Sequence, residues 1–335
     1  MLANPSPAPD TAAPVGVNAS ARAQVTVVIA AWRAAATIGR AVSSALAQPE
    51  AVEVIVVDDA SGDEGATINA AQMADDGTGR LKVYALSRNG GPSIARNAAI
   101  GASRAPWIAI LDSDDFMEPG RLGALMALAD KGYDLIADDL LQTPEGKPVS
   151  AGRPLWFGKD RTPIDISFGF FVDNNITRAS RQRRELGFLK PLVRRAFLEQ
   201  HGLIYDETMR LGEDYDLYAR ALSLGARMRL IPWTGYVSVM RGNSLSLNHS
   251  RSDLAALEAA DNRLLQQPIA AEDARLVKKH RFTTRSRITW IDFMAALKRG
   301  HVFRVAAIVL KDPRQAPYLA RGLWKTLTRR FSSKG

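Results

Sequence analysis

The chain has 335 residues, 46% of them hydrophobic and 24% charged, with a formal net charge of +9 and no cysteine. This length and apolar content predict a sizeable core plus an accessory segment, and the lack of cysteine excludes disulfides and thiolate metal sites, as is common in a reducing cytoplasm. Residues 1–24 are rich in Ala and Pro and lack the apolar centre of a signal peptide, so we expect a disordered leader. No apolar run reaches the roughly 18 residues of a transmembrane helix.

Three apolar segments have the length and composition of buried strands. They are residues 25–31, 53–57 and 107–111, and a helical pattern over about 34–48 separates the first two. Alternating strands and helices are typical of a mostly parallel sheet flanked by helices. The sequence therefore predicts an α/β fold.

Two of these strands end in aspartates. The second strand runs into Asp58 and Asp59, and the third runs into Asp112, Asp114 and Asp115. Ligands of open α/β sheets bind beyond the carboxyl ends of the strands, and clustered carboxylates repel one another unless a cation relieves them. Oxygen ligands of this kind suit Mg²⁺ or Mn²⁺ together with substrate phosphates. The pattern favours a metal that holds a nucleotide diphosphate; the alternative is an acidic strand-to-loop cap.

A glycine pair opens a predicted helix between the two acidic segments. Gly90 and Gly91 permit close approach of a ligand, Pro92 suits the first turn of a helix, and the free N–H groups there attract anions. Arg96 and Asn97 follow about one turn later and face either the phosphates or the acidic loop. We expect Arg96 to contact the nucleotide, whereas an ordinary loop-to-helix junction would explain the glycines alone.

Taken together and in this order, the motifs resemble the nucleotide-binding half of a family 2 glycosyltransferase with the GT-A fold. The resemblance covers about residues 25–240. It rests on the opening strand, Val56-Val57-Asp58-Asp59-Ala60-Ser61, Gly91 to Asn97, Leu111-Asp112-Ser113-Asp114-Asp115, and Leu211-Gly212-Glu213-Asp214-Tyr215-Asp216-Leu217. The family's usual Pro-x-Tyr-Asn-like segment after the first strand is Ala-Ala-Trp-Arg here.

The resemblance implies a role for each motif. Ala30, Ala31 and Trp32 line the nucleotide pocket, and Asp59 binds a uracil-type base. Trp32 either stacks on a ligand or anchors the following helix. Nucleotide and metal contacts come from the acidic loop: Asp112 and Asp114 bind around metal and ribose, and Asp115 is a further metal ligand.

The later acidic motif implies the catalytic base. Asp214 would take the proton of the acceptor hydroxyl as that oxygen displaces the nucleotide from the anomeric carbon, a single displacement that inverts the configuration. Glu213 is the rival base, although we expect it to cap the following helix, and Asp216 is a reserve candidate.

Basic residues gather in the C-terminal part. Residues 281–335 carry a net charge of +11, which leaves residues 1–280 at about −2. Helical patterns over 291–297 and 302–310, with Trp290, Trp324 and Tyr318 nearby, predict basic amphipathic helices that bind anionic lipid. The alternative is a solvated face on helices packed against the catalytic domain. No nucleic-acid recognition motif accompanies the charge.

The predicted organisation has three parts. Residues 1–24 form the leader, residues 25–250 the GT-A domain, and residues 251–335 the basic helical segment. Within the domain, the nucleotide half covers about 25–118 and the acceptor half about 119–250. On the acceptor side, phosphate-binding arginines, a loop over the site and one histidine are candidates: Arg178, Arg181, Arg183, Arg184, Arg241 to Leu247, and His249.

The whole chain is similar to succinoglycan-type exopolysaccharide glucosyltransferases. This likeness implies transfer of a hexose, with UDP-glucose favoured as donor, to a polyprenyl-diphosphate-linked saccharide at the cytoplasmic membrane face. The alternatives are another surface glycan pathway, such as lipopolysaccharide or capsule, and an inactive membrane adaptor. A nicotinamide dehydrogenase would need a Gly-x-Gly-x-x-Gly turn, which the sequence lacks.

Overall fold

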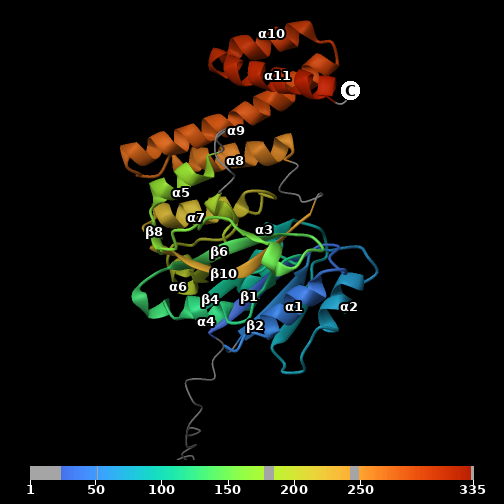
Figure 1. The fold of residues 1–335 in the computed structure, drawn as a ribbon, viewed down its shortest axis with the longest axis vertical. Coiled ribbons are helices and arrows are strands. Elements are labelled where there is room, and N and C mark those ends of the chain that lie inside the picture. Colours follow the sequence, from blue (N-terminus) through green and yellow to red (C-terminus); the bar gives the residue numbers. More distant parts are fainter. Residues whose placement is uncertain (1–23, 51, 177–184, 242–248, 333–335) are drawn as a thin grey trace, which may run out of the picture.

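The computed structural model describes residues 24–50, 52–176, 185–241 and 249–332. In this part of the chain ten strands form one mixed sheet with the order β3-β2-β1-β4-β9-β6-β10-β5, while β7 pairs with β6 and β8 with β10 (Figure 1). The strands are β1 (Val25–Ala31), β2 (Val52–Asp58), β3 (Leu81–Ala85), β4 (Trp107–Ile110), β5 (Phe116–Met117), β6 (Leu135–Pro144), β7 (Arg153–Pro154), β8 (Ile164–Ile166), β9 (Leu192–Arg194) and β10 (Met228–Met240).

Helices follow most of the strands, and the chain closes with four helices in succession. The helices are α1 (Ile38–Leu46), α2 (Ala66–Gln72), α3 (Pro92–Ala102), α4 (Arg121–Met126), α5 (Phe168–Asn175), α6 (Arg195–Gln200), α7 (Glu213–Ser223), α8 (Arg251–Leu264), α9 (Ala271–Lys298), α10 (Val302–Lys311) and α11 (Ala316–Ser332). Short 3-10 helices are η2 (Ala129–Lys131), η3 (Val149–Ala151), η4 (Leu186–Phe188) and η6 (Pro313–Gln315). The predicted α/β class is confirmed.

The parallel part of the sheet places the acidic motifs. Strand β1 pairs in parallel with β2 on one side and with β4 on the other, so the direction in which the sheet grows reverses at β1. These strands are apolar and almost entirely buried, as expected for a sheet covered on both faces. Their carboxyl ends therefore meet at one edge, beside a topological switch point where α/β folds bind ligands.

Helix α1 shows how the sequence pattern covers this sheet. Its buried residues recur at intervals of three and four positions and so form one apolar face: Ile38, Ala41, Val42, Ala45 and Leu46. The helix is shorter than the predicted 34–48, because Ala34 still belongs to the turn that leads into it.

The second half of the sheet is built differently. Strand β9 pairs antiparallel with both β4 and β6, whereas β10 runs parallel to β6. The register between β10 and β6 shifts between Ile231 and Tyr236, which indicates a bulge in β10. Such irregularities re-aim side chains next to functional sites.

The last helices fall into two pairs. Helices α8 and α9 pack against each other and on α5 and α7, while α10 and α11 pack on α9 and lie farthest from the strands (Figure 1). No helix among the described residues combines the length and apolar character needed to cross a membrane.

Polar side chains join α8 and α9 to α7. The hydroxyl of Tyr215 donates to Asp261 Oδ1 at 3.1 Å, and His280 Nδ1 lies 2.8 Å from Asp261 Oδ2. Asp261 is fully buried, and the Tyr215 and His280 rings stack with centroids 4.5 Å apart. The helical segment after residue 250 therefore begins as an integral part of the domain's packing, and only α10 and α11 resemble an appended tail.

Candidate active site

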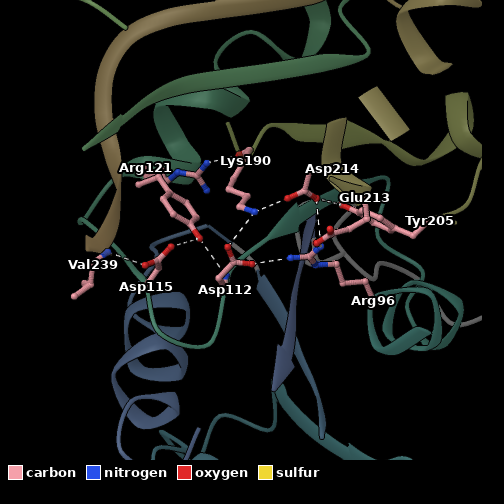
Figure 2. Close-up of polar contacts among 10 residues, drawn as sticks. Arg96, Asp112, Asp115, Arg121, Lys190, Tyr205, Glu213, Asp214 and Val239 are labelled. Atoms are coloured by element: carbon pink, nitrogen blue, oxygen red, sulfur yellow. Dashed lines mark hydrogen bonds and ion pairs between the residues drawn. The ribbon is translucent and has the colours of Figure 1, made fainter. Parts of the chain in front are cut away.

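Two acidic motifs that are about a hundred residues apart in the chain meet at the end of the parallel strands. Asp112 follows β4 and opens the loop to β5, while Glu213 and Asp214 begin α7. Two buried basic side chains lie between them, Arg96 from the second turn of α3 and Lys190 from the segment before β9 (Figure 2).

Arg96 and Lys190 connect the motifs through short ion pairs. Arg96 donates from Nη2 to Asp112 Oδ1 at 2.7 Å and from Nη1 to Glu213 Oε1 at 2.7 Å. Lys190 Nζ lies 3.0 Å from Asp112 Oδ2 and 2.5 Å from Asp214 Oδ2. The two cations thereby fix the distance between the acidic motifs.

These pairs set the protonation of the site. Burial works against the charge of Asp112, but Lys190 and Arg96 outweigh it and lower the pKa of Asp112 to about 2. Burial also opposes the charge of Lys190, yet its two aspartates raise the pKa of the ammonium. Burial raises the pKa of Glu213, the charge of Asp214 adds to the rise, and Arg96 opposes it.

The three aspartates of the β4–β5 loop have different surroundings. Both oxygens of Asp112 face the cations described above. Asp115 is buried, accepts hydrogen bonds from the Tyr236 hydroxyl at 2.9 Å and the Val239 amide at 2.8 Å, and has its pKa raised to about 8, first by burial and then by Asp112 and Asp114. Asp114 keeps 44% of its side chain exposed.

This arrangement limits how a metal can bind. Among the described residues, no three His, Asp or Glu side chains converge on one point in a way that suits a metal ion. Asp112 and Asp115 are engaged by other side chains and amides, and the predicted metal contacts of Asp112, Asp114 and Asp115 stay predictions. The exposed Asp114 still fits the mode in which Mg²⁺ or Mn²⁺ takes one protein carboxylate and completes its shell with substrate phosphates and water.

Asp59 holds the glycine loop. Its Oδ1 accepts from the Gly90 amide at 2.8 Å, and its Oδ2 accepts from the Gly91 amide at 2.7 Å and from Asn89 at 2.8 Å. Gly91 has φ +95°, a backbone conformation that favours glycine, and a Cβ there would lie 3.3 Å from Arg210 Cγ. A carboxylate offers about four acceptor positions, so these three hydrogen bonds do not use all of them. The predicted contact of Asp59 with a base stays a prediction.

The neighbouring residues Arg96 and Asn97 of α3 contact two different parts of the structure. Arg96 faces the acidic motifs, one of the two orientations considered from sequence, and its predicted contact with the nucleotide stays a prediction. Asn97 accepts from the Tyr205 amide at 3.0 Å and donates to the Tyr205 carbonyl at 3.0 Å. Tyr205 in turn donates from its hydroxyl to Asp214 Oδ1 at 3.1 Å.

The segment after β1 presents an exposed indole. Ala31 is buried and aligned with Asp58 of β2, whereas Ala30 is half-buried and Trp32 is 48% exposed. Trp32 is therefore not a hydrophobic anchor beneath α1, and the guanidinium of Arg33 lies over its ring, 4.9 Å from the centroid. The predicted nucleotide contacts of Ala30, Ala31 and Trp32 stay predictions.

The start of α7 corrects one expectation. Gly212, with φ +77°, occupies the N-cap, so Glu213 is the first helical residue and not the cap. Asp214 is buried and bound by Lys190, Tyr205 and, at 3.3 Å, Arg96. The reserve candidate Asp216 is fully buried and pairs with Arg220 and Arg263, away from Lys190 and Arg96.

Other acceptor-side candidates are only partly described. Arg178, Arg181, Arg183 and Arg184 lie outside the described residues, as does the segment 242–248 of the predicted loop. Arg241, just before that segment, reaches Asp114 Oδ2 at 3.4 Å. His249 directly precedes Ser250, the N-cap of α8, and its predicted role stays a prediction.

Sequence reasoning missed Lys190, Tyr205 and Tyr236. A single lysine before a three-residue strand carries no recognisable motif, and the two tyrosines look like ordinary core aromatics. Only the antiparallel insertion of β9 beside β4 and the bulge of β10 bring Lys190 and Tyr236 to Asp112.

Comparison with known proteins defines the class. The model of glycosyl transferase family 2 matches residues 26–211, and the chain belongs to this family. It is 46% identical to the succinoglycan biosynthesis protein ExoU of Rhizobium meliloti (strain 1021) over 95% of this chain and 92% of that protein. It is 41% identical to ExoO of the same organism, a second succinoglycan biosynthesis protein, over 72% of this chain and 68% of that one.

Solved structures share the fold. S. aureus TarS (residues 1–349) in complex with UDP-GlcNAc superimposes with a TM-score of 0.61 at 16% identity, covering 88% of this chain and 92% of that chain. The mannosyltransferase PcManGT from Pyrobaculum calidifontis, in complex with GDP-Man and Mn²⁺, gives a TM-score of 0.55 at 15% identity over 89% and 83%. The GT-A fold predicted from the motifs is confirmed.

Proposed function

We propose that this glycosyltransferase moves a hexose from a UDP-sugar, with UDP-glucose favoured, to a polyprenyl-diphosphate-linked saccharide in bacterial exopolysaccharide assembly. The observation that carries the proposal is the junction of Asp112 with the Glu213–Asp214 pair through Arg96 and Lys190. A donor-side and an acceptor-side acidic motif thus meet at one edge of the sheet. The names of the two succinoglycan relatives and the UDP-GlcNAc complex of TarS support the pathway and the donor class.

The proposed reaction is one inverting displacement. The acceptor hydroxyl oxygen bonds to the anomeric carbon, the bond from that carbon to the diphosphate oxygen breaks, and Asp214 takes the hydroxyl proton. Glu213 remains the rival base, because its pKa is raised and it lies on the same helix turn.

A divalent cation would bind through Asp114. Mn²⁺ or Mg²⁺ held there would supply charge for the departing diphosphate. Arg40 donates to the Asp114 carbonyl at 2.7 Å, and Arg241 reaches its carboxylate, so this chain adds two arginines around the same point. They would orient the loop and balance the charge of the diphosphate.

The second part of the proposal concerns location. We propose that α10 and α11 hold the enzyme on the anionic inner face of the cell membrane. Phe303 is 94% exposed and Leu310 is 76% exposed on α10, and Trp324 is 70% exposed on α11, amid the basic residues of this segment. Apolar side chains in a basic surface are typical of helices that lie in a membrane interface.

A hollow between α9 and α11 adds to this surface. Its volume is about 560 Å³, and the residues that line it include Trp290, Ile291 and Met294 together with Lys298 and Arg299. An anionic lipid head group would find both kinds of contact there.

A donor screen tests the proposed reaction. Labelled UDP-glucose, UDP-galactose and UDP-glucuronate are incubated with the protein and a lipid extract of a producing bacterium, and we expect label in the lipid-linked saccharide from UDP-glucose. Transfer only to protein or to free monosaccharide would contradict the pathway. Absence of transfer and of hydrolysis with every donor would favour the inactive adaptor.

A further inference from the structure

A buried ion pair behind the site has no role in the proposed displacement. Arg121 of α4 and Asp138 of β6 are both almost completely inaccessible to solvent, and Arg121 Nη2 donates to Asp138 Oδ1 at 2.8 Å. Removing one partner of a buried pair is costly, and a hydrophobic pair often stabilises a core as well or better. Stability alone is therefore a weak reason for this pair.

The arginine of this pair also contacts the backbone of Lys190. Arg121 Nη2 also donates to the Lys190 carbonyl at 2.5 Å, which fixes the backbone from which the lysine side chain extends to Asp112 and Asp214 (Figure 2). The other side holds the bulge of β10, since Asp138 Oδ2 accepts from the Gly235 amide at 2.9 Å and the Tyr236 amide at 3.0 Å.

Tyr236 carries this second connection to the acidic loop. Its hydroxyl donates to Asp115 Oδ2 at 2.9 Å and accepts from the Asp112 amide at 3.1 Å. Gly235 is part of the same arrangement, because a Cβ there would lie 2.7 Å from Arg121 Cγ. The Arg121–Asp138 pair thus binds the backbone of both Lys190 and Tyr236, and both of these residues contact Asp112.

We propose that Lys190 is the positioning residue that sets the donor motif at Asp112 against the acidic pair at Asp214, and that the Arg121–Asp138 pair fixes it there. The inference rests on the proposed glycosyl transfer. Lys190 acts through the two aspartates, because a shared ammonium holds both carboxylates at one separation. A displacement reaction depends on that separation, and a misplacement of about 1 Å costs on the order of 100-fold in rate.

The test compares Lys190→Ala, Lys190→Met and Lys190→Arg in the full chain, with the exposed Lys159→Ala as control. We expect kcat of Lys190→Ala to fall on the order of 100-fold while the donor KM changes less than about threefold. Propylammonium replaces the deleted atoms and should raise the kcat of Lys190→Ala at least roughly tenfold. Tetramethylammonium at equal concentration should not raise it. Lys190→Arg should keep more activity than Lys190→Met.

Two results would overturn the inference. One is a folded Lys190→Met variant, as judged by UDP calorimetry, with wild-type kcat. The other is a loss in Lys190→Ala that neither propylammonium nor the arginine variant relieves, which would mean a packing role. Failure of the wild-type protein to transfer from any UDP-sugar counts against the proposed function instead, so the two failures are distinguishable.

Discussion

The two ends of the molecule use basic side chains in opposite ways. At the site, Arg96, Lys190 and Arg121 are buried, and each contacts carboxylates at short distance. On α10, Arg304 and Lys311 are exposed, as is Phe303. A buried charge needs partners, so it fixes geometry, whereas an exposed charge constrains little and stays available to an anionic surface.

Helices α8 and α9 lie between these ends and belong with the first. Arg263 of α8 pairs with Asp206 and Asp216, and the Tyr215–Asp261–His280 contacts join both helices to Tyr215, the residue after the acidic pair. The boundary between the packed segment and the appended helices α10 and α11 therefore falls near residue 300. A cut at His280 would therefore remove part of the domain's packing.

Replacing the proposed base Asp214 should reduce activity more than any other change. Asp214→Asn keeps the shape but cannot accept a proton, so we expect transfer of labelled hexose to fall by about 10³-fold. UDP affinity, measured by calorimetry, should stay close to wild type and serves as the control for folding. Surviving transfer would move the base to Glu213, and Glu213→Gln is the companion variant.

The second prediction concerns a shortened chain without α10 and α11. A chain that stops after Gly300 retains all of α9 but loses α10 and α11, and each basic residue near an anionic surface contributes about 1 kcal/mol. We expect flotation with anionic vesicles to be lost and UDP binding to be kept. Phe303→Asp should weaken flotation without shortening the chain. Equal flotation of the full chain with anionic and neutral vesicles would contradict the membrane proposal.

A third prediction tests the contact between His280 of α9 and Asp261 of α8. His280→Leu leaves the buried Asp261 with one partner fewer, and we expect a loss of about 2 kcal/mol in the free energy of unfolding, measured with urea. His301→Leu is the matched control, because His301 is exposed and should change stability by less than about 0.5 kcal/mol. Identical urea midpoints for both variants would show that α8 and α9 do not depend on this contact.

The smallest effect concerns the metal. Asp114→Ala should lower the affinity for UDP in Mn²⁺ roughly tenfold and leave the affinity in EDTA unchanged, since one carboxylate of a shared shell is lost. The exposed Asp130→Ala is the control. If wild-type protein binds UDP equally in Mn²⁺ and in EDTA, Asp114 has no metal role.

Local features of the sequence were sufficient for the fold class and for locating the acidic motif after β4 and the glycine pair before α3. The strands before Asp58 and Asp112 show their apolar runs directly, and the glycine pair before α3 marks a backbone position that other residues cannot adopt. These features depend only on residues that are close together in the chain, so they can be recognised from the sequence alone.

The α/β order, the positions of both acidic motifs and the basic excess from residue 281 onward can therefore be read along the chain. What the charges do depends on the packing of distant segments. Lys190 and Arg121 become neighbours through the insertion of β9, Asp115 becomes buried through the bulge of β10, and α9 becomes part of the domain through Asp261 and His280. Each of these outcomes depends on the burial and pairing of groups far apart in the chain, and the cost of a buried charge is set by partners that no local pattern records.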